Sequence, residues 1–442
     1  MDNRSPHAAK LCADLSDISL YQTTGRVTQI VGSTIHATIA SGRIGELCRL
    51  RDPSGGQHIL AEIIGFSKGH AVLTPMGDIR GLSTRTEVVP LGQFSQMPVS
   101  DDLLGRVVDS FGQPMDGGHP IHTSQFDVIH KPAPDPMKRD VIAEPLACGV
   151  RAIDAFLTCG QGQRIGIYGE AGGGKSTLMS SIVKGCAADV CVIGMIGERG
   201  REVREFVEHH LGPEAMQKTV VVVSTSDRPA GERVMAAFAA TTVAEYFRDQ
   251  GKRVLLLMDS LTRFARAQRE IGLAAGEMPT RRGFPISVFT MLPNLLERAG
   301  PGMQGSITAF YTVLVEGDGT GDPIADETRG ILDGHLILSA KLGAENHYPA
   351  IDIMRSKSRL MTTVTSPDHI NAAGYLRDLM ATYDDIALLV KVGEYTAGSD
   401  PRADQALATR PLIKEFLKQR TDEFSSFDNT LDALRRIADA TE

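Results

Sequence analysis

The chain has 442 residues, of which 42% are hydrophobic and 23% are charged, and its formal net charge is −8. This length exceeds what one hydrophobic core normally covers, so about two or three domains are expected. The negative charge argues against nucleic acid as the main partner, and no apolar run approaches the length that crosses a bilayer. The charged start is unlike a signal peptide, and the six cysteines lack metal-type spacing; we expect a cytoplasmic protein with reduced thiols.

Residues 1–20 place Ala8, Leu11, Leu15 and Ile18 at steps of three or four residues, which predicts a short amphipathic helix. This apolar stripe has little neighbouring chain to bury against, so it could bind a partner protein or a membrane surface. The alternatives are a helix that docks on its own domain and a disordered chain end.

Residues 21–95 carry short strand-like runs separated by glycines: RVTQIVG, TIHATIA, AEIIGFS, HAVLTP and TEVVP. Short strands at nearly regular spacing predict a small β-barrel. The aromatic residues here are Tyr21, Phe66 and Phe94, fewer rings than a barrel that binds single-stranded nucleic acid needs for stacking. A structural or ring-assembly role is therefore the better interpretation.

Residues 96–365 alternate strand-like and helix-like runs. The runs QRIGIY, VCVIGMI, VVVVS, RVLLLMD, ITAFYTVL and HLILS are apolar enough to be strands buried on both faces, which predicts an α/β domain with a largely parallel sheet. Residues 366–442 carry the patterns AAGYLRDLMATY, DQALATRPLIKEFLKQR and TLDALRRIADA, which predict a C-terminal helical domain.

The strongest chemical signal is GEAGGGKST, which begins at Gly169 and matches G-x-x-x-x-G-K-[ST] between a predicted strand and a predicted helix. Glycines let backbone N–H groups wrap phosphates, and the N-terminus of the following helix adds positive potential. We expect Lys175 to reach the β- and γ-phosphates of ATP and the Ser176 hydroxyl to bind Mg²⁺. The predicted nucleotide-binding residues of this loop are Gly169, Glu170, Ala171, Gly172, Gly173, Gly174, Lys175, Ser176 and Thr177.

Two carboxylates follow later strands. Asp259 ends the run VLLLM, where a carboxylate beside a phosphate-binding loop is positioned to hold the hydration shell of Mg²⁺. Glu198 follows VCVIGMI and could point at the γ-phosphate, where hydrolysis needs a group that orients the attacking water. The alternative is that Glu198, Arg199, Arg201 and Glu202 form surface ion pairs around a helix start, and spacing alone does not separate the two interpretations.

The segments GEAGGGKST, IGERGREVREF, STSDRP, LLLMDSLTRFARAQREIGLAAGE, GSITAFYTVL and HYPAID follow one another in an order that resembles the type III secretion ATPases, relatives of the catalytic subunit of the rotary ATP synthase. The resemblance covers nearly the whole chain, including LLGRVVDSFGQPMDG and VGEYTAGSD. It implies a RecA-like P-loop ATPase domain of the α/β class, preceded by a small β-barrel and followed by a helical domain.

The resemblance also implies roles for single residues. It makes Glu198 the catalytic carboxylate, Arg199 a neighbour of the γ-phosphate, and Arg359 an arginine finger that reaches the site of the adjacent subunit. Tyr348 and Tyr395 would stack on the adenine, with ordinary core packing as the alternative. The expected catalytic residues are Lys175, Glu198, Arg199, Asp259 and Arg359, and the expected metal ligands are Ser176 and Asp259.

Because Lys175, Glu198 and Arg359 lie on one chain, a ring of identical copies can complete every site, and we expect a homohexamer. The resemblance implies ATP hydrolysis coupled to protein export, with chaperone release and substrate unfolding. It further implies a stalk regulator at the N-terminus, a central stalk protein, chaperone–substrate complexes at the C-terminal domain, and peripheral contact with an inner-membrane export gate.

Other classes remain open at this point. TSDRP and AEYFRDQGK favour an injectisome ATPase over a flagellar export ATPase. A rotary synthase subunit would need an unlike partner subunit, and an RNA-translocating ring helicase would need a basic, aromatic-lined barrel. A nucleotide-binding subunit without turnover would not need Glu198.

Overall fold

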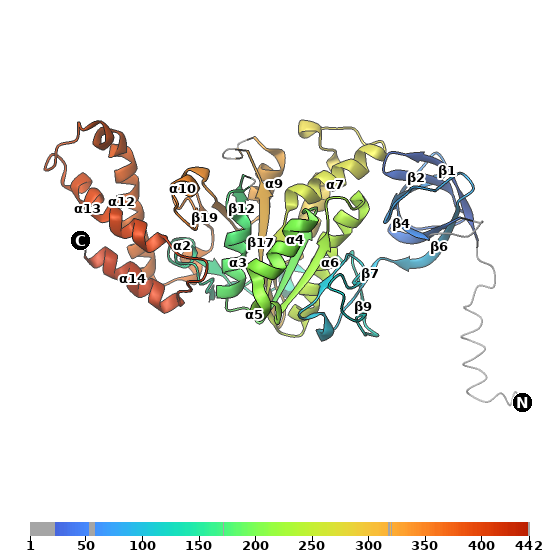
Figure 1. The fold of residues 1–442 in the computed structure, drawn as a ribbon, viewed down its shortest axis with the longest axis horizontal. Helices are drawn as coiled ribbons and strands as arrows, with labels where there is room; N and C mark the ends of the chain where they lie inside the picture. The colour runs from blue at the N-terminus through green and yellow to red at the C-terminus, as the bar shows by residue number, and fades with distance from the viewer. Residues whose placement is uncertain (1–22, 53–57, 171, 317–318, 320, 441–442) are drawn as a thin grey trace, which may run out of the picture. The chain divides into compact units, whose positions relative to one another are not determined.

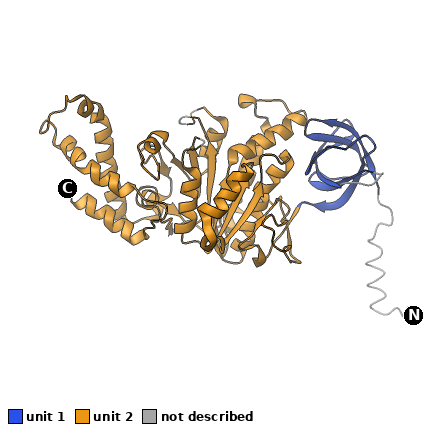
Figure 2. Cartoon of the chain, viewed as in Figure 1, with its two compact units in different colours: residues 1–95 blue, residues 96–442 orange. Residues whose placement is uncertain are grey.

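The computed structural model describes residues 23–52, 58–170, 172–316, 319 and 321–440. The amphipathic segment predicted in residues 1–20 lies outside the described residues, as do Cys12 and Ala171. The contacts divide the chain into two units, residues 1–95 and 96–442 (Figure 2). In the part of the chain that the structure describes, no helix is both long and apolar enough to cross a membrane.

The first unit is a closed barrel with the strand order β1-β2-β5-β4-β3-β6, as the sequence predicted. Alternate side chains, among them Ile35, Leu50 and Ile63, fill its interior with no exposed surface. The strand β3 was missed because three of the six residues of ELCRLR are charged; Arg49 and Arg51 are exposed, whereas Glu46 is buried. The strands are β1 (Gly25–Val31), β2 (Thr34–Thr38), β3 (Glu46–Arg51), β4 (Ile59–Ser67), β5 (His70–Pro75) and β6 (Glu87–Phe94).

The second unit is built on a nine-stranded sheet with the order β19-β18-β12-β17-β15-β13-β14-β8, and β16 pairs with β17 (Figure 1). Its central strands pair in parallel, which confirms the predicted sheet. The six predicted runs became β12 (Arg164–Gly169), β13 (Val190–Ile196), β14 (Thr219–Ser224), β15 (Arg253–Asp259), β17 (Ser306–Leu314) and β18 (Gly334–Ile337). The remaining strands, too short to give a pattern, are β8 (Val107–Val108), β16 (Gly300–Pro301) and β19 (Lys357–Ser358).

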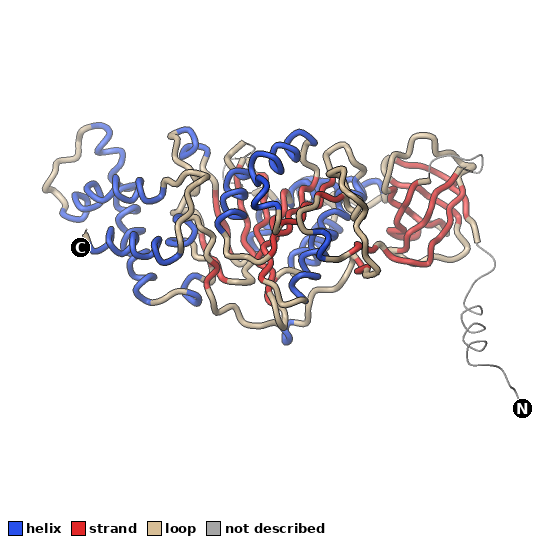
Figure 3. The backbone as a smooth tube through the Cα atoms, turned by 60° about the horizontal axis from the view of Figure 1, so that its bottom comes forward, coloured by secondary structure: helices blue, strands red, loops and turns tan. Residues whose placement is uncertain are grey.

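Helices cover both faces of this sheet, and the tube view in Figure 3 shows the strands between them. Ile193 of β13 shares a core with Ile182 of α3 (Lys175–Gly185). At the next position a Cβ on Gly194 would lie 3.1 Å from the Ala240 Cβ of α6 (Ala230–Asp249). Because successive residues of a strand point to opposite faces, α3 and α6 lie on opposite sides of the sheet.

The other elements of this unit are shorter or lie at its edges. Two further pairs of strands are β7 (Gln96–Pro98) with β9 (Phe126–Val128), and β10 (Pro145–Leu146) with β11 (Cys159–Gly160). The other helices are α2 (Arg151–Phe156), α4 (Gly200–Glu205), η3 (Phe206–Leu211), α5 (Gly212–Met216), α7 (Leu261–Ala274), α8 (Ile286–Leu296), α9 (Pro323–Ile331), α10 (Ala340–Ala344) and α11 (Met361–Val364), with single turns η1 (Asp101–Leu103), η2 (Pro136–Lys138) and η4 (Arg281–Gly283).

The C-terminal helices are α12 (Pro367–Val392), α13 (Pro401–Leu417) and α14 (Phe427–Asp439), drawn in orange to red in Figure 1. They pack around α2, so their buried residues Leu379 and Leu434 belong to the same core cluster as Phe156. The run DQALATRPLIKEFLKQR predicted a helix to Arg420, but α13 ends at Leu417. The residues after Leu417 do not continue the helix but make contacts with other parts of the chain.

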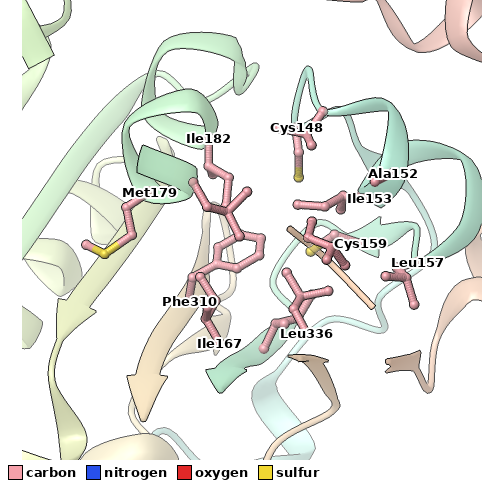
Figure 4. Packing of buried hydrophobic residues seen from close by; sticks show 14 of the residues in the cluster. Cys148, Ala152, Ile153, Leu157, Cys159, Ile167, Met179, Ile182, Phe310 and Leu336 are labelled. Carbon is pink, nitrogen blue, oxygen red and sulfur yellow. The ribbon is translucent and has the colours of Figure 1, made fainter. Parts of the chain in front are cut away.

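Figure 4 shows the core of this unit. Four side chains without exposed surface meet there: Ile153 of α2, Ile182 of α3, Ile167 of β12 and Phe310 of β17.

The prediction of reduced thiols is confirmed for the described cysteines, which are free and buried: Cys48, Cys148, Cys159, Cys186 and Cys191.

Candidate nucleotide site

The loop between β12 and α3 has a backbone that only glycines adopt easily. Gly172 and Gly174 have φ values of +79° and +84°, in the left-handed region that side chains disfavour. A Cβ on Gly173 would lie 3.1 Å from the Glu170 carbonyl oxygen. The loop ends at the N-terminus of α3, where unpaired backbone N–H groups favour an anion. This geometry fits the phosphates of a nucleotide.

Lys175 is the first residue of α3 and is 7% exposed. Its Nζ donates to the Gly169 carbonyl oxygen at 3.0 Å and to the Glu170 carbonyl oxygen. Burial lowers the pKa of Lys175, whereas the carboxylates of Asp259 and Glu198 act in the opposite direction. The ammonium group therefore lies between the loop and both predicted carboxylates.

Asp259 and Glu198 lie at the carboxyl edge of the sheet, because Asp259 pairs with Met195 of the neighbouring parallel strand. Both side chains are buried, and the Thr312 hydroxyl of β17 donates to Asp259 Oδ1 at 2.5 Å. Burial raises the pKa of both carboxyl groups, and the nearby charge of Asp259 raises the pKa of Glu198 further.

Arg263, in the first turns of α7, holds Glu198 in place. Its Nη2 donates to Glu198 Oε2 at 2.9 Å, and its Nη1 donates to the Gly197 carbonyl oxygen at 2.8 Å. This residue was not predicted from the sequence. The available signal was its position four residues after Asp259, about one turn into a helix that starts at the same sheet edge.

The two interpretations left open for the segment after β13 apply to different residues. Glu198 is 6% exposed and faces the site. Arg199 instead forms a 3.2 Å ion pair with Glu202, and its side chain is 77% exposed. Within one chain, Arg199 therefore lies on the surface rather than beside Lys175.

A cavity of about 820 Å³ adjoins the loop, large enough for a nucleotide. Gly172, Gly174 and Thr177 line one side of it, together with Tyr348, whose ring would lie 3.7 Å from a Cβ on Gly174. Residues 418–423 of the C-terminal domain form another wall. This wall was not predicted from the sequence, because residues 418–420 were predicted to belong to a helix.

Two predicted site residues lie elsewhere in the chain. Tyr395 is not among the described residues that line the cavity; its hydroxyl donates to Asp404 Oδ1 at 2.8 Å. Arg359 is exposed, and its Nη2 donates to the Arg329 carbonyl oxygen at 3.0 Å. The structure thus brings Lys175, Glu198 and Asp259 together, but not Tyr395 or Arg359.

The fold and this site define a nucleotide-binding protein of the ATP synthase alpha/beta family. The nucleotide-binding domain of that family matches residues 149–358, and its β-barrel domain matches residues 27–92. The T3SS EscN ATPase C-terminal domain matches residues 365–436. Within this family, the chain belongs to the type 3 secretion system ATPases, because it shares more than half of its residues with such proteins over nearly its whole length.

Single members of this family match the chain over nearly its whole length. The chain is 56% identical to the type 3 secretion system ATPase of Sinorhizobium fredii over 98% of this chain and 96% of that protein. It is 52% identical to that of Xanthomonas euvesicatoria over 96% of each chain. The flagellum-specific ATP synthase of Treponema pallidum is 46% identical over 93% of this chain and 92% of that protein.

Solved structures agree with this assignment. The assembled ATPase EscN from the type III secretion system of enteropathogenic E. coli has a TM-score of 0.89 and 48% identity, covering 94% of this chain and 100% of that chain. EscN has also been solved with its central stalk EscO, with a TM-score of 0.86, 47% identity and the same coverage. The resemblance stated from the sequence is confirmed.

Proposed function

We propose that this chain hydrolyses ATP as a subunit of a ring, and that hydrolysis drives protein export by a type 3 secretion system, with chaperone release and substrate unfolding. The observation that carries the proposal is the cluster of Lys175, Glu198 and Asp259 at one sheet edge, in a chain 56% identical to such an ATPase. The proposal that hydrolysis drives protein export rests on the similarity to these relatives.

The site residues divide the work of hydrolysis. Lys175 and the N–H groups of the loop bind the phosphates. The Ser176 hydroxyl and the Asp259 carboxylate offer the oxygen ligands that Mg²⁺ prefers, and the ion would supply positive charge beside the phosphates. Glu198 orients and deprotonates the attacking water, and Arg263 fixes the direction of that carboxylate.

Arg359 would complete the site of the adjacent subunit. It is exposed and is not among the described residues that line the cavity of its own chain, as expected for a finger that acts across an interface. Arg199, which is also exposed, would approach the γ-phosphate only after the segment that follows β13 rearranges. Tyr348 would contact the adenine. Tyr395 is not among the described residues that line the cavity, so its proposed contact with the adenine rests on the resemblance.

The proposed partners rest on the same similarity to type 3 secretion system ATPases. The assembled EscN supports a homo-oligomeric ring, for which we propose six copies, and EscO supports a central stalk partner. We extend the proposal to a stalk regulator at residues 1–20, chaperone–substrate complexes at the C-terminal helices, and peripheral contact with the export gate from the cytoplasm. Flagellar export is the second candidate, because three flagellum-specific relatives are 43%, 46% and 45% identical, below the 56% and 52% of the two type 3 secretion ATPases named above.

Replacing Lys175 by Ala tests the proposal. The purified wild-type protein should hydrolyse ATP, and the variant should lose hydrolysis and bind ATP weakly, because the phosphates lose their cation. Lys184→Ala is the matched control, since Lys184 is an exposed lysine in the last turn of the same helix. In a strain that lacks the gene, only the wild type and the control should restore effector secretion. Restored swimming without secretion would instead assign the chain to the flagellum.

A further inference from the structure

The segment 418–423, which forms one wall of the nucleotide cavity, belongs to no helix or strand. It connects α13, which ends at Leu417, to α14, which begins at Phe427. Connecting loops are usually the most mobile part of a domain. A loop that shapes a binding site therefore needs contacts that hold it.

Arg151, the first residue of α2, provides many of these contacts. Its guanidinium group donates to the Phe416 carbonyl oxygen at 2.7 Å, to the Lys418 carbonyl oxygen at 2.5 Å and to the Glu423 carboxylate. The side chain is 16% exposed. Because arginine presents its N–H groups in a fixed planar fork, one residue holds both ends of the loop.

Gln419 holds the loop from the inside and is 8% exposed. Its Oε1 accepts from the Arg151 backbone N–H at 2.9 Å, and its Nε2 donates to the carbonyl oxygens of Gly149 and Glu423, each at 2.7 Å. Its own backbone N–H donates to the Tyr348 carbonyl oxygen at 2.8 Å. The loop and Tyr348, which line the same cavity, are thus joined at one residue.

The base of this arrangement is a hydrogen-bonded turn packed against α3. The buried Asp154 carboxylate accepts from the backbone N–H groups of Cys148 and Gly149, each at 2.9 Å. A Cβ on Gly149 would lie 2.7 Å from the Gly185 Cα, so the turn lies directly against the end of α3. The loop is therefore fastened to the same helix whose first turn carries Lys175.

We propose that Arg151 and Gln419 are positioning residues that fix residues 418–423 and Tyr348 as the wall for the nucleoside part of ATP. The phosphates would bind at the loop between β12 and α3, beside Lys175. This inference rests on the proposed function and adds to it residues that set affinity for the nucleoside without taking part in phosphate binding or hydrolysis.

The test compares ATP with inorganic tripolyphosphate, which has the phosphates but no nucleoside. Each is used to displace a fluorescent ATP analogue from the full-length wild type, Arg151→Ala and Gln419→Ala. We expect the Kd for ATP to rise about tenfold in both variants, with less than about a twofold change for tripolyphosphate. The KM for ATP should rise in parallel, with kcat within about twofold of the wild type. Arg151→Lys should recover little, because one ammonium group does not span the same acceptors.

The control is Arg139→Ala. Arg139 is also 16% exposed and also donates to backbone carbonyl oxygens, those of Glu297 and Ala299, but it lies near the amino end of β12 rather than the nucleotide edge. The affinity of the Arg139→Ala variant for ATP should stay at the wild-type value.

If Arg151→Ala does not fold, the comparison of ATP with tripolyphosphate in Gln419→Ala tests the inference by itself. Unchanged ATP affinity in a folded variant, or an equal loss for ATP and tripolyphosphate, would overturn the inference. Failure of the proposed function would instead appear as a wild type without hydrolysis.

Discussion

Arg263 of α7 and Glu198 after β13 form an ion pair whose closest N···O distance is 2.7 Å. The pair holds the Glu198 carboxylate at the sheet edge that also carries Lys175 and Asp259. Burial and the charge of Asp259 raise the pKa of Glu198, whereas Arg263 lowers it. A carboxylate in such a balance is suited to take a proton from water near neutral pH.

The first prediction concerns Glu198→Gln. The amide keeps the shape of the side chain but does not act as a base, so kcat should fall by about 10²-fold or more. ATP affinity should change little, because the loop and Lys175 are intact. Steady-state hydrolysis and displacement of a fluorescent nucleotide measure the two effects. Glu208→Gln, which alters the exposed pair of Glu208 with Arg204 in the same segment, is the control and should hydrolyse ATP normally. Hydrolysis by Glu198→Gln at the wild-type rate would remove Glu198 from the mechanism.

The second prediction concerns pH. In the proposed mechanism only the ionised form of Glu198 can act as the base, and the pKa of this side chain is raised above the ordinary 4.5 of a glutamate. The value of kcat/KM should therefore rise with pH, about tenfold per unit, until that raised pKa is passed. Arg263→Gln removes the cation that lowers this pKa, so the rising limb should move to higher pH. Hydrolysis rates of the wild type and of Arg263→Gln, measured between about pH 5.5 and 9.5, give the position of the rising limb in each protein. A limb that stays in place or moves to lower pH in the variant contradicts the assigned pairing.

The third prediction concerns the stability of the turn beneath the nucleotide cavity. Asp154 accepts one backbone N–H with each carboxylate oxygen. Asn offers one acceptor and places an N–H group against the second donor, so Asp154→Asn should destabilise the protein by about 1–3 kcal/mol. Urea unfolding followed by circular dichroism measures the change. The exposed Asp432→Asn on α14 should shift the free energy by less than about 0.5 kcal/mol. Equal stabilities of the two variants would mean that the turn does not depend on the carboxylate.

Patterns local in the sequence predicted most of this fold. Strands buried on both faces read as continuous apolar runs, and the glycines of the phosphate-binding loop have a fixed spacing with one physical cause. The strand β3 was missed because three of its six residues, ELCRLR, are charged and interrupt the apolar run. The site was predicted where a residue lies at the carboxyl end of a strand: Asp259 is the last residue of β15, and Glu198 follows β13 after Gly197.

What the sequence did not reveal depends on contacts between distant segments. Arg151 and Gln419 are 268 residues apart, and no periodicity joins them. The helix α13 ends at Leu417 because the Gln419 N–H donates to the Tyr348 carbonyl oxygen and its side chain to Gly149. Such tertiary bonds override the local helical pattern, and only the folded chain shows them.

The central claim is that each site needs Glu198 from one subunit and Arg359 from its neighbour. Glu198→Gln and Arg359→Ala should each bind ATP and hydrolyse it very slowly when assembled alone. When the two variants are mixed in equal amounts, an Arg359→Ala subunit keeps Glu198 and receives Arg359 from any Glu198→Gln neighbour. Head-to-tail rings of random order should then recover about one quarter of the wild-type rate, because half of the sites keep Glu198 and half of those receive the finger.

The measurement is the ATPase rate of this mixture, with differently tagged copies purified in tandem to show that mixed rings have formed. Recovery to about one quarter of the wild-type rate is the predicted result for a finger supplied across a head-to-tail interface. Mixed rings that stay as inactive as either variant alone would contradict the account.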